Sequence, residues 1–221
     1  MGARHYCILS AVIRIDPGCP DPETVRLSAD VIRRGGVVCY PADTIYGLGC
    51  DPLNRHALQR IFTIKGRPES RGFLVLVPDM AAVRRLAAEL PPEAVALVAR
   101  FWPGPLTLIL SARPGLPPEL TGDGSTIGVR QPLNAFLEAW MRELQGPIVS
   151  TSANRSGEPT PTEPVELRRL FESVVDLFLE SVEPLQGIPS TVVDLSRRPF
   201  RIVREGVLAG PVEAFLKAQE A

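Results

Sequence analysis

Residues 37–49 have the sequence VVCYPADTIYGLG, and this stretch decides how the chain can fold. It begins with four residues that predict a short buried strand, and it continues through Pro41 into a polar segment that contains glycine. Thr44 lies in that segment, just beyond the end of the predicted strand. Because open α/β sheets bind ligands outside the ends of their strands, the stretch predicts a strand that leads into a binding loop.

The flanking segments predict more strands and helices. Residues 5–15 favour a strand, and a helix is expected to begin at Asp21 and to end at Gly35-Gly36. Asn54 is a plausible N-terminal cap for the next helix, which runs to Ile64. Other helices are predicted at residues 80–89, 92–101, 134–144 and 165–171, and other strands at residues 73–77, 106–111, 126–130, 147–150, 174–179, 191–195 and 200–204. This order indicates an α/β fold with a mixed sheet, in one domain over residues 1–221, since no repeat or long linker divides the chain.

Composition excludes several classes of protein. Hydrophobic residues make up 45% of the 221 residues and charged residues 22%, which is typical of a globular domain. The net charge of -1 gives no overall attraction to nucleic acid, so any anion site must be local. The N-terminal apolar stretch before Asp16 predicts a strand and not a cleaved signal, and no apolar run is long enough for a membrane span. We therefore expect a cytoplasmic protein without a membrane partner.

Four cysteines lie in the first quarter of the chain, at positions 7, 19, 39 and 50. Their spacing fits neither a metal knuckle nor a small disulfide framework. Cys39 and Cys50 have apolar neighbours, which predicts two reduced core residues.

The residues suited to chemistry are hydroxyls and cations placed just after apolar runs. They are Thr44; Lys65, Arg67 and Arg71; Ser125, Thr126 and Arg130; Ser150, Thr151, Ser152 and Asn154; and Ser190, Thr191 and Arg204. The set contains no histidine or cysteine nucleophile and no carboxylate pair, which argues against triad hydrolysis and glycosidase chemistry. Guanidinium forks, a lysine and hydroxyls suit a polyanion, so the set favours phosphoryl or nucleotidyl transfer. Neither standard nucleotide-binding glycine loop is present.

Single motifs leave other interpretations open. Residues 65–68 alone could be a solvated basic turn, and residues 150–154 alone could be a helix cap and turn. The segment 102–105, WPGP, favours an architectural turn over a ligand contact.

Together, however, the motifs resemble a known family. In chain order they are PADTIYGLG (41–49), KGRP (65–68), FWPGPLT (101–107), TIGVR (126–130), STSAN with SG (150–154 and 156–157) and STVVD (190–194). Their order and spacing resemble the YrdC/TsaC family of threonylcarbamoyl-AMP synthases from about residue 21 to residue 206.

The resemblance implies a twisted, open mixed sheet of the YrdC type, flanked by helices, with a large concave and positively charged cavity. The implied activity joins L-threonine, bicarbonate and ATP into L-threonylcarbamoyl-AMP and releases pyrophosphate, with Mg²⁺ accompanying ATP and no direct protein ligand to the metal. The product would serve the threonylcarbamoyl modification of adenosine 37 in ANN-decoding tRNAs, through a downstream tRNA transfer complex.

The resemblance also implies roles for particular residues. The threonine contacts would be Thr44, Arg130, Ser150 and Ser190. The ATP contacts would be Lys65, Arg67, Arg71, Thr126, Ser152, Asn154, Thr160 and Arg204, with Lys65 and Arg67 catalytic beside the phosphates.

The sequence departs from many members of the family. Leu76 stands where many members have a histidine that helps to hold threonine. We also expect the short type of the family, without the additional C-terminal domain of longer members. Two alternative functions are a non-catalytic module that binds double-stranded RNA or tRNA, and a carbamoyltransferase-type relative with another acceptor.

Overall fold

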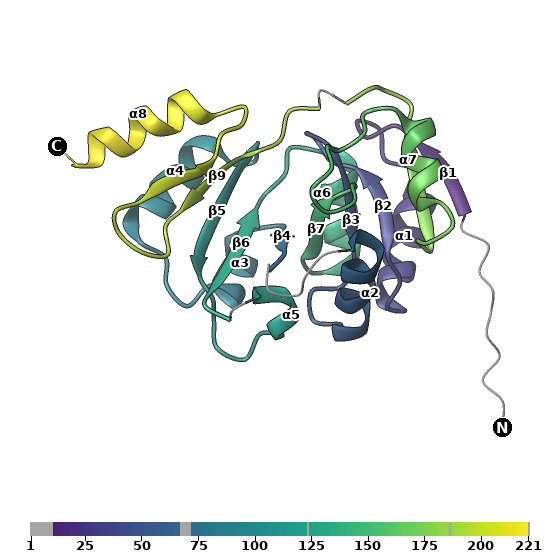
Figure 1. The fold of residues 1–221 in the computed structure, drawn as a ribbon, viewed down its shortest axis with the longest axis horizontal. Coiled ribbons are helices and arrows are strands. Elements are labelled where there is room, and N and C mark those ends of the chain that lie inside the picture. The colour runs from purple at the N-terminus through teal and green to yellow at the C-terminus, as the bar shows by residue number, and fades with distance from the viewer. Residues whose placement is uncertain (1–10, 67–71, 123, 186, 221) are drawn as a thin grey trace.

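The structure is a computed structural model that describes residues 11–66, 72–122, 124–185 and 187–220. Its strands are β1 (Ala11–Ile15), β2 (Val38–Pro41), β3 (Tyr46–Gly49), β4 (Leu74–Leu76), β5 (Leu106–Ser111), β6 (Thr126–Arg130), β7 (Ile148–Ser152), β8 (Leu177–Ser181), β9 (Thr191–Asp194) and β10 (Arg201–Arg204). Its helices are α1 (Pro22–Arg33), α2 (Arg55–Lys65), α3 (Met80–Leu86), α4 (Pro92–Phe101), α5 (Pro118–Thr121), α6 (Ala135–Leu144), α7 (Pro164–Phe171) and α8 (Ala209–Glu220). Figure 1 shows the strands side by side across the width of the molecule.

Within the described residues the strands form one mixed sheet in the order β1-β8-β2-β3-β7-β4-β6-β5-β9-β10. The pairs β1/β8, β2/β8, β4/β6 and β5/β9 are parallel, and the remaining neighbours are antiparallel. Strand β7 joins the two halves of the sheet. Its first residues, up to Ser150, pair with β4, whereas Thr151 and Ser152 pair with β3.

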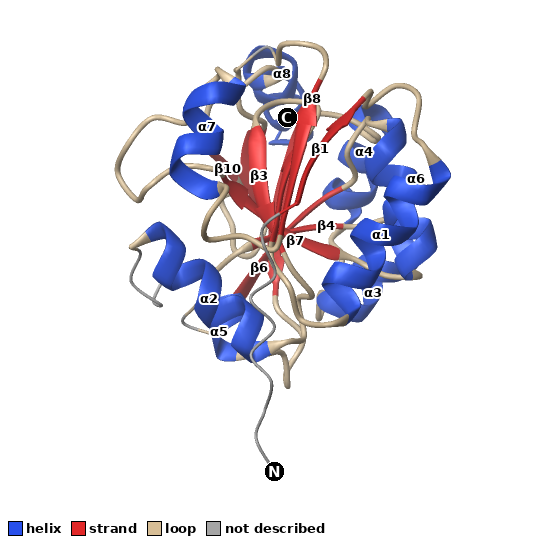
Figure 2. Cartoon of the chain, turned by 90° about the vertical axis from the view of Figure 1, so that its right-hand side faces the viewer, coloured by secondary structure: helices blue, strands red, loops and turns tan. Residues whose placement is uncertain are grey.

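Helices cover both faces of the sheet. Figure 2 shows α1, α3, α4 and α6 on one side of the strands and α2, α5 and α7 on the other. Four of these helices begin at residues whose side-chain oxygen accepts a backbone N–H three positions later, which satisfies a donor that the helix itself leaves unpaired. The four caps are Asp21, Asn54, Asp79 and Asn134, and the bonds measure 2.8, 3.1, 2.7 and 3.0 Å.

The predicted α/β fold with a mixed sheet is confirmed, and most predicted elements are present with their ends moved by a few residues. The main error concerns residues 42–49, which were predicted as one loop. Their second half is strand β3, which forms an antiparallel hairpin with β2. Strand β7 also extends to Ser152, two residues into a predicted loop, and helices α5 and α8 were not predicted.

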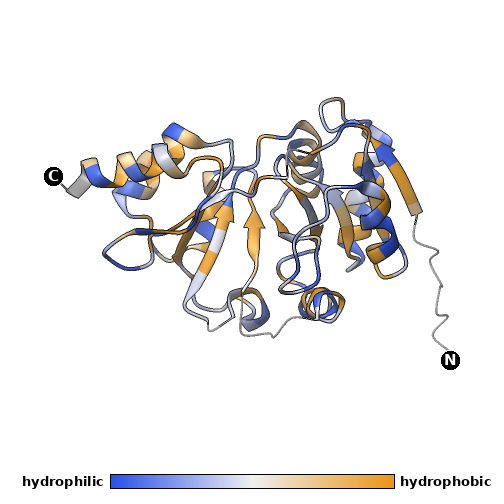
Figure 3. Cartoon of the chain, turned by 45° about the horizontal axis from the view of Figure 1, so that its top comes forward, coloured by the Kyte–Doolittle hydropathy of each residue, from blue (hydrophilic) through white to orange (hydrophobic). Residues whose placement is uncertain are grey.

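Apolar side chains fill the space between the sheet and its helices. Figure 3 shows the hydrophobic residues, in orange, concentrated along the strands. Cys39 and Cys50 are free and fully buried, as predicted, and burial raises the pKa of both thiols. Cys19 is free and exposed, and Cys7 lies outside the described residues. In the described part of the chain, no helix has the length and hydropathy required to cross a bilayer.

Trp140 is expected to be a main contributor to stability. It is completely buried on α6 and meets the Tyr40 ring edge-on at 5.3 Å between centroids. Trp140→Ala should lower the free energy of unfolding by about 3–5 kcal/mol, because it removes a large apolar side chain and leaves a cavity. Urea unfolding measures this loss. Val165→Ala on α7 is the control, since Val165 is 80% exposed and the change should stay within about 0.5 kcal/mol. Equal effects of the two substitutions would contradict the prediction.

Candidate active site

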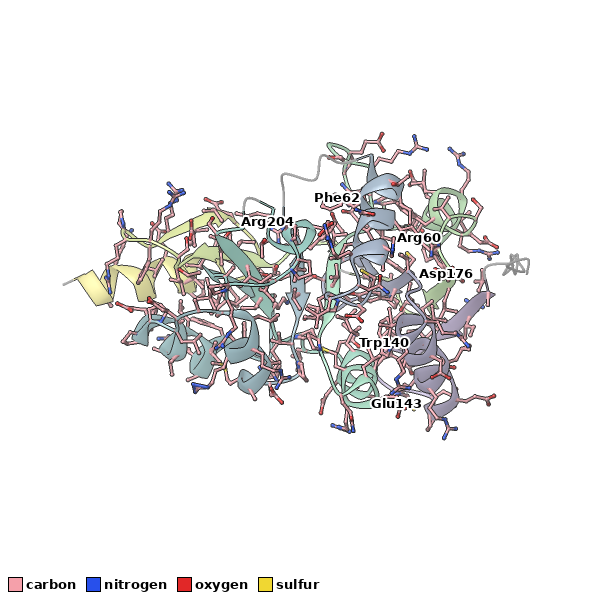
Figure 4. The ribbon with its side chains drawn as sticks, turned by 90° about the horizontal axis from the view of Figure 1, so that it is seen from below. Arg60, Phe62, Trp140, Glu143, Asp176 and Arg204 are labelled. Carbon is pink, nitrogen blue, oxygen red and sulfur yellow. The ribbon has the colours of Figure 1, made fainter. Side chains whose placement is uncertain are left out.

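A cavity of about 400 Å³ lies where β7 passes from one half of the sheet to the other. Its walls come from β3 to β7, β9, β10, helix α5 and the loop before β3. The lining residues are Ala42, Thr44, Ile45, Tyr46, Gly47, Gly72, Phe73, Leu74, Thr107, Ile109, Thr121, Thr126, Gly128, Arg130, Ser150, Thr151, Ser152, Ser190, Val192 and Arg204. Figure 4 shows Arg204 on the same side of the sheet as Arg60 and Phe62 of α2, and opposite Trp140 of α6.

The structure brings many of the predicted site residues together in this cavity. Those that line it are Thr44, Thr126, Arg130, Ser150, Ser152, Ser190 and Arg204. They come from separate segments whose only common feature in the sequence is a position at or just beyond the end of an apolar run. The sheet order places these segments side by side, because strands β3 to β7 and β9 all contribute to one region.

Arg130 is held in one orientation by its neighbours. Its side chain is buried, and it donates from Nε to the Gly104 carbonyl at 3.0 Å, from Nη1 to Thr44 Oγ1 at 3.2 Å and from Nη2 to Asp43 Oδ2 at 2.5 Å. Burial lowers the pKa of Arg130, and the charge of Asp43 partly offsets that effect. The segment WPGP therefore acts as architecture, as predicted, because it supplies the Gly104 carbonyl behind the guanidinium.

Asp43 is a residue that the sequence did not reveal. Its Oδ2 also accepts the backbone N–H of Leu133 at 3.2 Å, so the carboxylate ties the loop before β3 to Arg130 and to the segment after β6. Its position beside Thr44 in the binding loop was the only available signal. Thr107 and Thr121 also line the cavity without having been predicted.

Arg204, Ser190 and Thr107 form a second polar cluster. Arg204 donates from Nε and Nη2 to the Ser190 carbonyl at 3.1 and 2.9 Å, and from Nη2 to Ser190 Oγ at 2.9 Å. Ser190 Oγ and Thr107 Oγ1 are 2.8 Å apart. Burial, and secondly the positive charge of Arg130, lower the pKa of Arg204. The two arginines therefore act on each other across the cavity, and an anion between them would relieve that repulsion.

Lys65 lies behind the cavity wall. Its side chain is buried, and Nζ donates to the Ser152 carbonyl, to the Asn154 carbonyl at 3.0 Å and to Asn154 Oδ1 at 2.9 Å. Ser152 Oγ contacts the same Oδ1 at 2.5 Å. Lys65 and Asn154 are thus linked to the lining residue Ser152, although neither is itself among the described residues that line the cavity.

The other predicted residues lie elsewhere. Thr160 is partly exposed and is not among the described lining residues. Arg67 and Arg71 lie outside the described residues, so their roles stay predictions. Leu76 is buried in the apolar cluster that contains Trp140, and the lining residue on the same strand is Leu74.

The charged side chains among the described lining residues are Arg130 and Arg204, and the rest of the polar lining is hydroxyl and backbone. In the described part of the chain no group of three or more His, Cys, Asp or Glu side chains could hold a metal ion. Such a cavity can bind anions through guanidinium and hydroxyl donors.

Residues 30–206 match the family model Sua5/YciO/YrdC, whose description is "Telomere recombination". The chain belongs to this family. The Sua5/YciO/YrdC match includes all of the residues that line the cavity, from Ala42 to Arg204.

Relatives of this Sua5/YciO/YrdC chain carry an enzyme name. This chain is 36% identical over 193 residues to the threonylcarbamoyl-AMP synthase of Pyrococcus abyssi. The match covers 87% of this chain and 56% of the relative. The chain is 37% identical over 176 residues to the threonylcarbamoyl-AMP synthase of Nitrosococcus oceani, a match that covers 80% of this chain and 95% of the relative. The chain therefore spans just over half the length of the first relative and almost all of the second.

A solved structure supports the same family. The crystal structure of P. abyssi Sua5 complexed with L-threonine superposes with a TM-score of 0.88 at 33% identity, covering 93% of this chain and 61% of that one. The YrdC-type sheet predicted from the sequence motifs is thereby confirmed.

Proposed function

We propose that this protein is an L-threonylcarbamoyl-AMP synthase, which converts L-threonine, bicarbonate and ATP into L-threonylcarbamoyl-AMP and pyrophosphate. The observation that carries the proposal is the cavity itself, in which an oriented guanidinium, a second arginine and hydroxyls from five strands or loops converge. Two relatives that carry this enzyme name, and a related structure complexed with L-threonine, support it.

Arg130 suits the carboxylate of threonine. Its bonds to Gly104, Thr44 and Asp43 use three of the five guanidinium N–H groups, so two remain for a ligand in the cavity that Arg130 lines. A carboxylate accepts such a pair as a fork, which fixes its orientation as well as its position. Thr44 and Ser150 add short hydroxyls to the same end of the cavity, which we call the amino-acid end.

Thr126, Ser152 and Arg204 suit the nucleotide. Their hydroxyl and guanidinium groups can donate to phosphate or ribose oxygens. Arg67 and Arg71 would add positive charge that offsets the charge of the triphosphate. Mg²⁺ would neutralise part of the triphosphate charge. The donor set fits a metal held by phosphate and water oxygens, because the described lining residues supply hydroxyls but no carboxylate.

The reaction needs little acid–base help from the protein. The threonine amine attacks the carbon of bicarbonate, and water leaves to give a carbamate. A carbamate oxygen then forms a bond to the α-phosphorus of ATP while the bond from that phosphorus to pyrophosphate breaks. The attacking carbamate is already anionic, so we assign the rate to proximity and to charge stabilisation by fixed donors.

Pyrophosphate release from ATP, Mg²⁺ and bicarbonate tests the proposal. We expect release that depends on L-threonine, much less with L-serine, and an adenylate product of the mass of threonylcarbamoyl-AMP. No release with any amino acid, together with salt-sensitive RNA binding, would favour the RNA-binding module instead. Release that depends on a different acceptor would favour the carbamoyltransferase-type relative.

We also propose the setting of this activity. The product would be passed to a tRNA threonylcarbamoyl-transfer complex, which modifies adenosine 37 of ANN-decoding tRNAs. Such an activity belongs in the cytoplasm, where ATP, threonine and tRNA occur together.

A further inference from the structure

The segment that begins at the last residue of β10 is hydrogen-bonded to the wall of the cavity. We call residues 204–208 the clasp. Besides the three bonds from Arg204 to Ser190, the clasp donates from Val207 N to the Pro189 carbonyl at 3.4 Å and from Leu208 N to Thr191 Oγ1 at 2.9 Å. Every one of these bonds ends on residues 189–191, the loop that carries Ser190 into the cavity.

Gly206 lies in the middle of the clasp, directly against that loop. A Cβ atom at this position would lie 2.5 Å from both Ser190 C and Thr191 N, and it would also meet the Pro189 carbonyl oxygen. Real Cβ atoms do not approach other atoms so closely, and the obstructing atoms are backbone, which cannot rotate away. A side chain at position 206 must therefore push residues 189–191 away from the clasp.

Ser190 cannot move without disturbing the rest of the cavity. Its Oγ contacts Arg204 Nη2 and Thr107 Oγ1, and the next residue, Thr191, donates its backbone N–H to the Pro105 carbonyl at 2.9 Å. Pro105 is adjacent to Gly104, whose carbonyl accepts from Arg130. The clasp therefore supports both arginines of the site through one short loop.

We propose that Gly206 is a positioning residue for Ser190 and its partner Arg204, since it lets the clasp fix both side chains in the cavity. This inference deepens the proposed function and rests on it for its kinetic test. It concerns a residue that does not itself line the cavity, so Gly206 acts through Ser190 and not by contact with a substrate.

The test compares Gly206→Ala with Gly210→Ala. Gly210 lies four positions later, in α8, and a Cβ there would meet no atom within 4 Å. We expect Gly206→Ala to raise the KM for L-threonine by roughly 10- to 100-fold, because displacements near 1 Å in a binding site have effects of that size. The KM for ATP should rise as well, because Arg204, which we assign to the nucleotide, is bonded to Ser190. Gly210→Ala should match the wild type in both.

A double-mutant cycle separates positioning from general loss of structure. If Gly206 acts through Ser190, Gly206→Ala should add little to the threonine KM of Ser190→Ala. If Gly206→Ala does not fold, Thr191→Val takes its place in the cycle, because it removes only the acceptor of the Leu208 N–H. Fully additive effects, or an unchanged KM for threonine in Gly206→Ala, would overturn the inference.

Hydrogen exchange supplies a measurement that does not depend on activity. The backbone amides of residues 190–193 should exchange faster in Gly206→Ala than in Gly210→Ala, which has the same added methyl group. Unchanged exchange in Gly206→Ala would refute the claim that the clasp fixes residues 189–191, even in an active enzyme. Faster exchange in Gly206→Ala, together with a wild-type chain that forms no adenylate, would support the clasp and reject the proposed function.

Discussion

Replacing Arg130 with lysine is expected to raise the KM for L-threonine by roughly 30- to 100-fold, which corresponds to about 2–3 kcal/mol of binding. Lysine keeps the positive charge beside Asp43, so the fold should persist, but it cannot reach the Gly104 carbonyl, Thr44 and a carboxylate as a fork. Steady-state kinetics with threonine and ATP varied separately measure the effect. The KM for ATP should change by less than about threefold.

Arg142→Lys is the matched control for this substitution. Arg142 lies on the surface of α6, where its side chain is 74% exposed and pairs with Glu138 one turn away. Exposed pairs of this kind contribute little, so Arg142→Lys should leave the kinetics and the unfolding midpoint unchanged. A normal threonine KM in Arg130→Lys would show that the amino-acid carboxylate binds elsewhere in the cavity.

Replacing Lys65 with methionine should lower turnover by roughly 100-fold or more, comparable to the loss of one preorganised catalytic donor. The hydrogen bonds of Lys65 explain how its replacement would lower turnover. Nζ donates to the Ser152 and Asn154 carbonyls and to Asn154 Oδ1, so its loss frees the end of β7 beside Ser152, a proposed nucleotide contact. Pyrophosphate release under saturating substrates measures the change. Near-normal turnover would contradict the importance of this lysine.

Two further variants define how Lys65 acts. Lys217→Met removes the other lysine of the chain, which is 72% exposed and paired with Glu213 on α8, and should have no effect. Asn154→Ala removes the shared acceptor of Lys65 and Ser152 while leaving the lysine in place. A partial loss of turnover in Asn154→Ala would indicate that Lys65 positions Ser152, whereas normal turnover would point to a direct role at the phosphates.

Much of the fold could be predicted because its signals are local. Asp21, Asn54 and Asn134 each satisfy a helix N-terminus within three residues, and β5 and β6 have the bounds that their apolar runs predict. Strand β3 was missed because it consists of only four residues, two of them glycine, which have low strand propensity. Gly49 is needed there for a reason visible only in three dimensions, since a Cβ atom would lie 2.8 Å from the Val149 carbonyl oxygen.

The candidate site was also predicted only in part, because local signals are visible in the sequence and contacts between distant residues are not. Hydroxyls and arginines at or near strand ends were predicted and do line the cavity, because strand ends are where α/β sheets bind ligands. Asp43 was not, since its function depends on Arg130, which follows 87 positions later. Thr107 could have been found, because it is the one polar residue among the first five of β5 and the alternation of a strand places it on the same side as Ile109, which also lines the cavity.

The divided pairing of β7 has a consequence for motion. Ser150 and Ser152 face the same cavity, but their backbones are bonded to opposite halves of the sheet. The part of the cavity wall formed by β7 therefore cannot widen unless ladder hydrogen bonds break on one side. Substrates would then enter and leave past the rim of the cavity at the loop of residues 42–45 and at α5, while the clasp keeps the loop at residues 189–191 in place.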